Sequence, residues 1–140
     1  MKNEAVIGGI TVAGQPTDEE LRNLRARGFT TLVNVRAAGE LDEPEETKAT
    51  AAGLRYAEAG FTASTLSEEH VKRIRDAVES SAGPVAIHCA GGTRAAVVAA
   101  IISAEKTSAS ADEALRKIDE AGFDVEGTPY ALFVRRYFQR

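Results

Sequence analysis

The sequence has few residues that build disulfides or metal sites. Its 140 residues include one cysteine, Cys89, and only two histidines. A single cysteine cannot form an internal disulfide, which favours a reducing, cytoplasmic location and leaves no second thiol to resolve an intermediate. Cys89 and the histidines show no recognised ligand spacing, so we expect no metal ion and no cofactor.

Long apolar runs and excess positive charge are also missing. No hydrophobic stretch approaches the length of a membrane span, and the first residues do not open a signal peptide. The net charge of -4 argues against general binding to nucleic acid. With 44% hydrophobic and 27% charged residues, the composition is that of a soluble globular protein. We expect one domain, residues 1–140, with a core of its own.

The strongest functional signal is a short apolar strand that runs into Cys89 and then into a helix. Loop amides and a helix N-terminus at such a turn can bind one anion, and the same field favours a thiolate. We therefore expect Cys89 to titrate below the usual value of about 8.5. Gly91 and Gly92 allow the backbone conformations of a tight loop. Arg94, in the first helical turn, becomes favourable once an anion is bound.

Two residues of this loop have simpler interpretations as well. Cys89 could be a small apolar core residue at the end of a buried strand. His88 could orient the loop or help to ionise Cys89, or its ring could simply be satisfied by the backbone.

The rest of the sequence alternates strands with helices. Strands are expected as a hairpin over residues 5–13 and at 29–35, 54–57 and 85–88. Helices are expected after Thr17 with Glu20 in a capping box, before Gly53, after Ser67, over 94–104, after Ser110 with Glu113, and after Thr128. This alternation predicts an α/β fold whose central, mainly parallel sheet is flanked by helices, with the site beyond the carboxyl ends of the strands.

Several motifs in this order resemble the protein-tyrosine-phosphatase-like superfamily. The resemblance is closer to the small bacterial beta-lactamase hydrolase-like, phosphatase-like family, which is also described as a sulfur transferase family. The motifs are Ala13–Pro16, Gly28–Phe29, Val33–Arg36 with Gly39–Glu40, Gly53–Tyr56 and His88–Arg94. They span about residues 8 to 123 and leave out the last helix, Thr128 to Arg140.

The resemblance implies a three-layer architecture like that of dual-specificity phosphatases. It also implies that Cys89 is the nucleophile and that an oxyanion binds to Arg94 and to the amides of Ala90, Gly91, Gly92 and Thr93. Phosphatases of this superfamily separate the cysteine and the arginine by five residues, whereas four separate Cys89 from Arg94, as in rhodanese-type sulfurtransferases. The phosphatases also place a hydroxyl residue directly after the arginine, where this chain has Ala95.

The general acid of a phosphatase is also hard to find. No carboxylate occurs in Phe61–Ser67, where the resemblance would place it. Transfer of sulfur needs no such proton, so the sequence favours a sulfurtransferase in which Cys89 forms a persulfide. The donor would be thiosulfate or a persulfide, and the acceptor an external thiol. The alternative is a phosphatase that hydrolyses a phosphoester through a phosphocysteine, and a third is an inactive module that binds an anion or phospho-ligand.

Other side chains near the strand ends have weaker assignments. Arg36 could contact the anion or could pair with Glu40. Glu58 and Glu40 are possible acids, although either could be a surface residue. Asn34 is expected to bond to the neighbouring loop backbone.

The carboxyl-terminal segment mixes aromatic residues with arginines. We interpret it as a docked helix with Leu132, Phe133 or Tyr137 buried, and not as a surface for nucleic acid or membranes. We expect a monomer or a weak homodimer.

Overall fold

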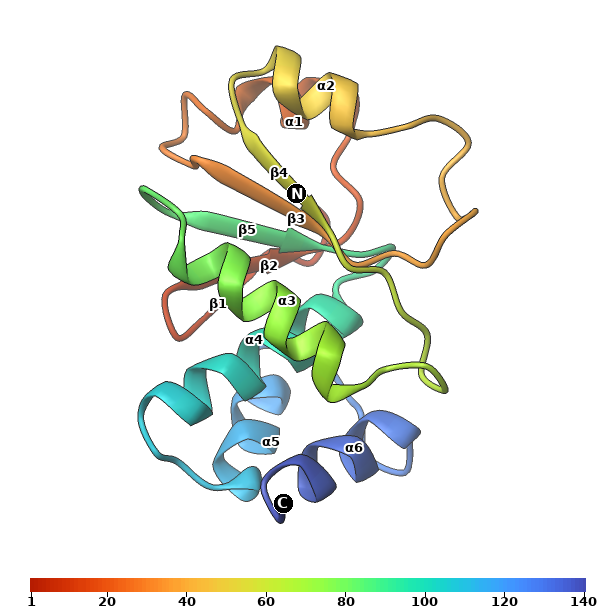
Figure 1. The fold of residues 1–140 in the computed structure, drawn as a ribbon, viewed down its shortest axis with the longest axis vertical. Coiled ribbons are helices and arrows are strands. Elements are labelled where there is room, and N and C mark those ends of the chain that lie inside the picture. The colour runs from red at the N-terminus through yellow and green to blue at the C-terminus, as the bar shows by residue number, and fades with distance from the viewer.

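The computed structural model describes residues Met1–Arg140 and contains one five-stranded sheet (Figure 1). The strands are β1 (Ala5–Ile7), β2 (Ile10–Ala13), β3 (Thr31–Asn34), β4 (Arg55–Glu58) and β5 (Val85–His88). Their order in the sheet is β1-β2-β5-β3-β4. β1 pairs antiparallel with β2, and the other neighbours are parallel. The predicted hairpin and mainly parallel sheet are confirmed.

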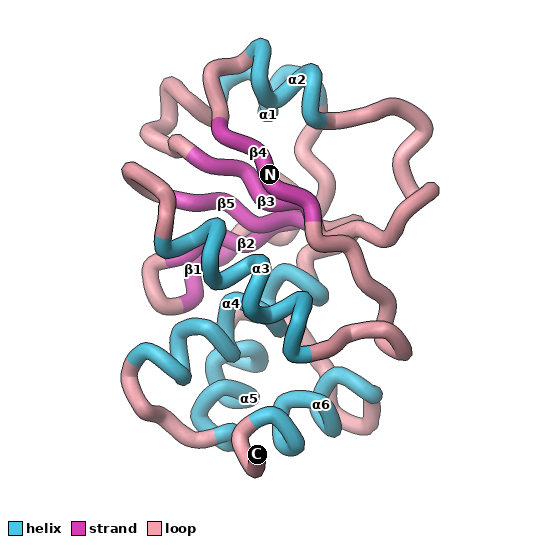
Figure 2. Tube along the Cα trace, in the orientation of Figure 1, coloured by secondary structure: helices cyan, strands magenta, loops and turns pink.

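Helices cover both faces of the sheet. They are α1 (Asp18–Asn23), α2 (Glu46–Ala51), α3 (Glu68–Glu79), α4 (Thr93–Lys106), α5 (Ala111–Glu120) and α6 (Pro129–Tyr137). Figure 2 shows α1 and α2 on one side of the strands and α3 and α4 on the other, with α5 and α6 beyond α4. The buried apolar residues accordingly form a smaller cluster under α1 and α2 and a larger one around α4.

The helix starts follow the capping signals in the sequence. Thr17 and Glu20 form the predicted capping box of α1. At α5, Ser110 accepts the Glu113 N–H at 3.2 Å, which is the side-chain-to-backbone half of the predicted box. Pro129 opens α6, where its missing N–H removes no helical hydrogen bond.

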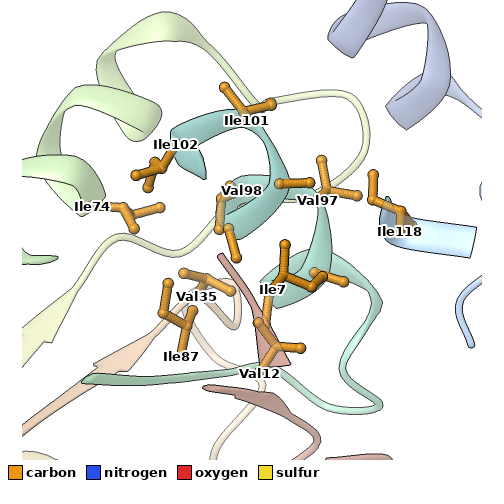
Figure 3. Packing of buried hydrophobic residues seen from close by; sticks show 14 of the residues in the cluster. Ile7, Val12, Val35, Ile74, Ile87, Val97, Val98, Ile101, Ile102 and Ile118 are labelled. Atoms are coloured by element: carbon orange, nitrogen blue, oxygen red, sulfur yellow. The ribbon is translucent and has the colours of Figure 1, made fainter. Parts of the chain in front are cut away.

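The central helix α4 is buried on every side. All ten residues from Ala95 to Ala104 are buried, because the sheet, α3 and α5 pack around it. In Figure 3, Val97, Val98, Ile101 and Ile102 of α4 lie among side chains from the strands and the other helices. Small residues at the remaining positions, five alanines and Ser103, let these neighbours approach closely. Arg94 and the start of the helix are therefore held by the core.

The last helix docks through one face. Ala131, Val134 and Tyr137 are buried, whereas Leu132 is 47% exposed. The spacing of three residues places the buried side chains on one stripe of the helix. The prediction of a docked helix is confirmed through Tyr137, and Leu132 points to solvent. None of the helices is both long and apolar enough to cross a membrane.

Candidate active site

The Cys89 loop lies at the carboxyl end of β5, the central strand, and leads directly into α4. Gly92 precedes the helix with a φ of 104°, a conformation that favours glycine. A Cβ at Gly92 would lie 2.8 Å from a ring carbon of Phe123, so a larger residue would not fit. Gly91 has no positive φ and has open space around it. Of the two glycines, only Gly92 needs its special backbone freedom.

The sulfur of Cys89 meets a backbone donor, although its side chain packs with the core. The residue is only 1% exposed, and the Gly92 N–H donates a hydrogen bond to Sγ over 3.1 Å. A donor at a helix N-terminus stabilises a thiolate more than a thiol. The loop therefore offers Sγ one backbone donor at the N-terminus of α4, and the side chain also packs as a small buried residue.

Arg94 is held by Glu40 through two short bonds. Its Nη1 and Nη2 lie 2.7 and 2.9 Å from the two carboxylate oxygens, and Nη1 also donates to the Phe61 carbonyl at 3.2 Å. The Nε–H and one N–H of Nη2 have no partner within the protein. These two donors form the side edge of the guanidinium, a fork that matches an oxyanion.

The same pairing sets the charge of Glu40. The hydrogen bonds from Arg94 lower the pKa of the Glu40 carboxyl to about 2, against the opposing effect of burial, and raise the pKa of Arg94. Glu40 is therefore ionised at neutral pH and has no proton to give to a leaving group. Its position is that of a residue that orients Arg94.

Arg36 follows β3 and is also directed to Glu40. Its Nη2 donates to the Glu40 carbonyl at 3.1 Å, and its Nε lies 3.5 Å from Oε1 of that residue. Nη1 donates to Gln15 Oε1 at 3.1 Å. The side chain is 17% exposed, so it is not a solvated loop arginine. The structure places it behind the Glu40–Arg94 pair, where it supports the carboxylate.

Asn34 and Glu58 lie at the ends of two adjacent strands. Asn34 Oδ1 accepts the Arg36 N–H at 2.9 Å, the predicted bond to loop backbone, and Nδ2 donates to the Tyr56 hydroxyl at 3.0 Å. The Tyr56 hydroxyl in turn donates to Glu58 at 2.8 Å. Asn34 and Glu58 line an open recess of about 620 Å³ whose walls include Arg36 but not Cys89.

His88 is fully buried and contacts a residue that the sequence analysis did not identify. Its Nδ1 lies 3.4 Å from the Cys89 carbonyl oxygen, and its Nε2 lies 2.5 Å from Oε1 of Glu45. Glu45 is 4% exposed and accepts a second bond from Gln15 at 2.7 Å. Gln15 belongs to one of the motifs noted above, but Glu45 lies in a polar segment with no distinguishing signal.

The carboxyl-terminal half supplies an aromatic neighbour of the loop, Phe123, and a partly buried tyrosine on α6. Phe123 packs against Gly92. Tyr130 of α6 is partly buried, and burial raises the pKa of its hydroxyl while the charge of Arg94 lowers it and that of Cys89 raises it further.

A cysteine between a β-strand and a buried helix, with an arginine in the first helical turn, is the arrangement that the resemblance to cysteine phosphatases predicts. The family model described as "Beta-lactamase hydrolase-like protein, phosphatase-like domain" matches residues 4–106. The chain belongs to this family. The match ends with α4, earlier than the limit of residue 123 suggested by the motifs, so Phe123 and Tyr130 lie beyond it.

Curated relatives share this part of the chain. A beta-lactamase hydrolase-like protein of Agrobacterium fabrum is 34% identical over 102 residues, which are 68% of this chain and 23% of that protein. One from Xylella fastidiosa is 27% identical over 121 residues, or 83% of this chain and 28% of that protein. The chain thus spans about a quarter of the length of these relatives.

Solved structures share the whole fold. Tk-PTP in its active form superposes with a TM-score of 0.78 at 22% identity, covering 93% of this chain and 90% of that one. The core catalytic domain of the PP-IP phosphatase SIW14 from S. cerevisiae gives 0.75 at 17% identity, covering 95% and 83%. P. aeruginosa TpbA gives 0.74 at 16% identity, covering 99% and 92%. The predicted tyrosine-phosphatase-like architecture is confirmed, whereas the sulfurtransferase prediction finds no support in these comparisons.

Proposed function

We propose that this chain is a cysteine-dependent phosphatase. The Cys89 thiolate attacks the phosphorus of a phosphomonoester, the bond from phosphorus to the leaving oxygen breaks, and a phosphocysteine forms. Water then attacks the phosphorus, the S–P bond breaks, and inorganic phosphate leaves with regeneration of the thiolate. No metal or second cysteine takes part in either step.

The observation that carries this proposal is the hydrogen bond from the Gly92 N–H to Cys89 Sγ, 3.1 Å long, at the N-terminus of α4. It stabilises the attacking thiolate before substrate binds. The free edge of Arg94 offers two further donors for the phosphoryl oxygens, whose charge grows in the transition state. Because Glu40 already binds the end of the guanidinium, at Nη1 and Nη2, Arg94 needs little reorientation to bind them.

The family relationship supports phosphoryl transfer over sulfur transfer. The family is described as phosphatase-like, and the neighbours in fold include a PP-IP phosphatase. The spacing of four residues between Cys89 and Arg94 favours sulfur transfer when the sequence is taken alone. In the folded chain the same spacing places the Gly92 N–H 3.1 Å from Cys89 Sγ and leaves the Nε–H and one Nη2 N–H of Arg94 free for phosphoryl oxygens.

The absence of a placed acid restricts the substrate. Glu40 is ionised and bound to Arg94, and Glu58 is bound by Tyr56 in the neighbouring recess. General acid catalysis contributes about 10² to 10⁴ in rate when the leaving oxygen needs a proton. We therefore propose aryl phosphates, whose phenolate leaves without one, as the preferred class.

Hydrolysis of p-nitrophenyl phosphate by the purified protein tests the proposal, with an alkyl phosphate and thiosulfate-to-cyanide sulfur transfer assayed beside it. We expect aryl-phosphate turnover, inhibition by vanadate and loss of turnover in Cys89→Ser. Sulfur transfer without phosphate release would refute the phosphatase and restore the sulfurtransferase. If vanadate binds equally to the wild type and Cys89→Ser and neither chemistry occurs, the domain is a binding module.

A further inference from the structure

Behind the Cys89 loop lies a buried pair of titratable side chains that the proposed reaction does not use. His88 is fully buried, Glu45 is 4% exposed, and 2.5 Å separates the ring nitrogen Nε2 from Glu45 Oε1. The second ring nitrogen, Nδ1, faces the Cys89 carbonyl at 3.4 Å. The imidazole thus bridges a carboxylate and the peptide group that follows the nucleophile.

Both ring nitrogens face oxygen atoms. A neutral imidazole has one N–H and can donate either to Glu45 or to the Cys89 carbonyl, but not to both. Only an imidazolium donates to both oxygens. Burial acts to raise the pKa of the Glu45 carboxyl, but the bond from His88 lowers it. Gln15 and the Tyr56 hydroxyl lower it further, so the net shift is downward and the ionised carboxylate is favoured.

The second oxygen of Glu45 connects this pair to the rest of the site. It accepts a hydrogen bond from Gln15 Nε2 at 2.7 Å. The backbone N–H of Gln15 donates to the Ala90 carbonyl at 3.1 Å, and its side-chain oxygen accepts from Arg36. Arg36 leads to Glu40 and so to Arg94. A continuous set of polar contacts therefore runs from the back of the Cys89 loop to the guanidinium.

We propose that Glu45 is a positioning residue of the active site, which holds His88 with both ring nitrogens protonated so that the ring fixes the Cys89 peptide. The fixed peptide keeps the following loop, with the Gly92 amide, turned toward the sulfur. A buried ion pair is weak evidence of stability, because apolar residues of similar volume often serve as well. What Glu45 adds is orientation of one imidazole against one carbonyl. The catalytic consequence rests on the proposed function, but the protonation of His88 does not.

Nitrogen-15 NMR of the histidine rings tests the protonation directly. The chain has only two histidines, and a His70→Gln variant assigns the signals of the other. At pH 7 we expect two protonated ring nitrogens for His88 in the wild type and one bare nitrogen in Glu45→Gln, which has nearly the same shape. Glu43→Gln is the matched control, since Glu43 lies in the same segment, is 72% exposed and pairs only with Lys48. It should leave the His88 signals unchanged.

Two further measurements report on the nucleophile. The ultraviolet absorbance of the single thiolate should fall in Glu45→Gln at pH 7, and kcat for p-nitrophenyl phosphate should drop about tenfold with little change in KM. A purely structural role would lower the melting temperature without changing the His88 signals of the folded protein.

A bare His88 nitrogen in the wild type would overturn the proposal, and this result does not depend on whether any variant folds. Unchanged His88 and thiolate signals in folded Glu45→Gln would overturn it as well. If both signals change as expected but the wild type hydrolyses no phosphoester, the positioning role stands and the proposed function fails.

Discussion

Replacing Glu40 by glutamine would separate the charge of this side chain from its shape. The carboxylate makes two charge-assisted bonds to Arg94, at 2.7 and 2.9 Å, and the amide can supply only one acceptor. The shift of the Glu40 pKa from 4.5 to about 2 corresponds to about 3 kcal/mol at full value. Because the carboxylate is 29% exposed, solvent screening reduces the expected loss of stability to about 1–2 kcal/mol.

The lowered pKa of Glu40 also predicts how the stability difference between the two proteins changes with pH. The pKa of Glu40 is lower in the folded protein than in the unfolded chain, so its stabilisation is complete above pH 4.5 and disappears as the pH falls toward about 2. Urea unfolding of the wild type and Glu40→Gln should therefore differ by a constant amount from pH 5 to pH 7. The difference should shrink below that range.

A suitable control is Glu79→Gln, because Glu79 is exposed and makes no ion pair in the structure. Its effect should stay within about 0.5 kcal/mol at every pH. Equal stability of wild type and Glu40→Gln at pH 7, or a difference that persists unchanged to pH 3, would refute the assignment of a strong Glu40–Arg94 pair.

Four other substitutions test the loop and the fold. Gly92→Ala should lose about 1–3 kcal/mol in urea unfolding, because the φ of 104° is strained for alanine and its Cβ meets Phe123; Gly91→Ala, with open space around it, should change stability by less than about 1 kcal/mol. Equal losses at the two glycines would contradict this difference. Thr17→Ala should cost about 1 kcal/mol through loss of the α1 cap, and an unchanged unfolding midpoint would count against it. Ile87→Ala, at a fully buried position of the central strand, should cost about 2–5 kcal/mol, and a loss below 1 kcal/mol would show that the core repacks.

The sequence predicted the elements whose signals are local. The Thr17 box, the Gly-Gly hairpin and the apolar stretch before Cys89 depend on neighbouring residues, and each forms in the structure. The strand β4 lies at the edge of the sheet and none of its four side chains is buried, so its residues carry little of the apolar signal of a core strand. The composition of α6 does not predict which of its apolar side chains are exposed. That depends on which face of the helix packs against the other helices.

The residues of the site also fall into two groups, those that the local sequence predicts and those that it does not. The positions of Cys89, Gly92 and Arg94 follow from their order in one loop. The partners of that loop come from distant segments: Glu40 and Glu45 lie about fifty and forty residues before it in the sequence. A glutamate in a polar segment has the same local signal whether it is solvated or buried beneath a histidine, so only the folded chain distinguishes them.

The complete burial of α4 has a consequence for ligand affinity. The loop amides and the guanidinium that we propose to bind the anion adjoin the most tightly enclosed helix of the protein, so we expect their directions to be set before any ligand arrives. Little conformational entropy is lost when the anion docks. Even a small inorganic oxyanion, with few atoms to contribute, should therefore compete well with a larger ester for this loop.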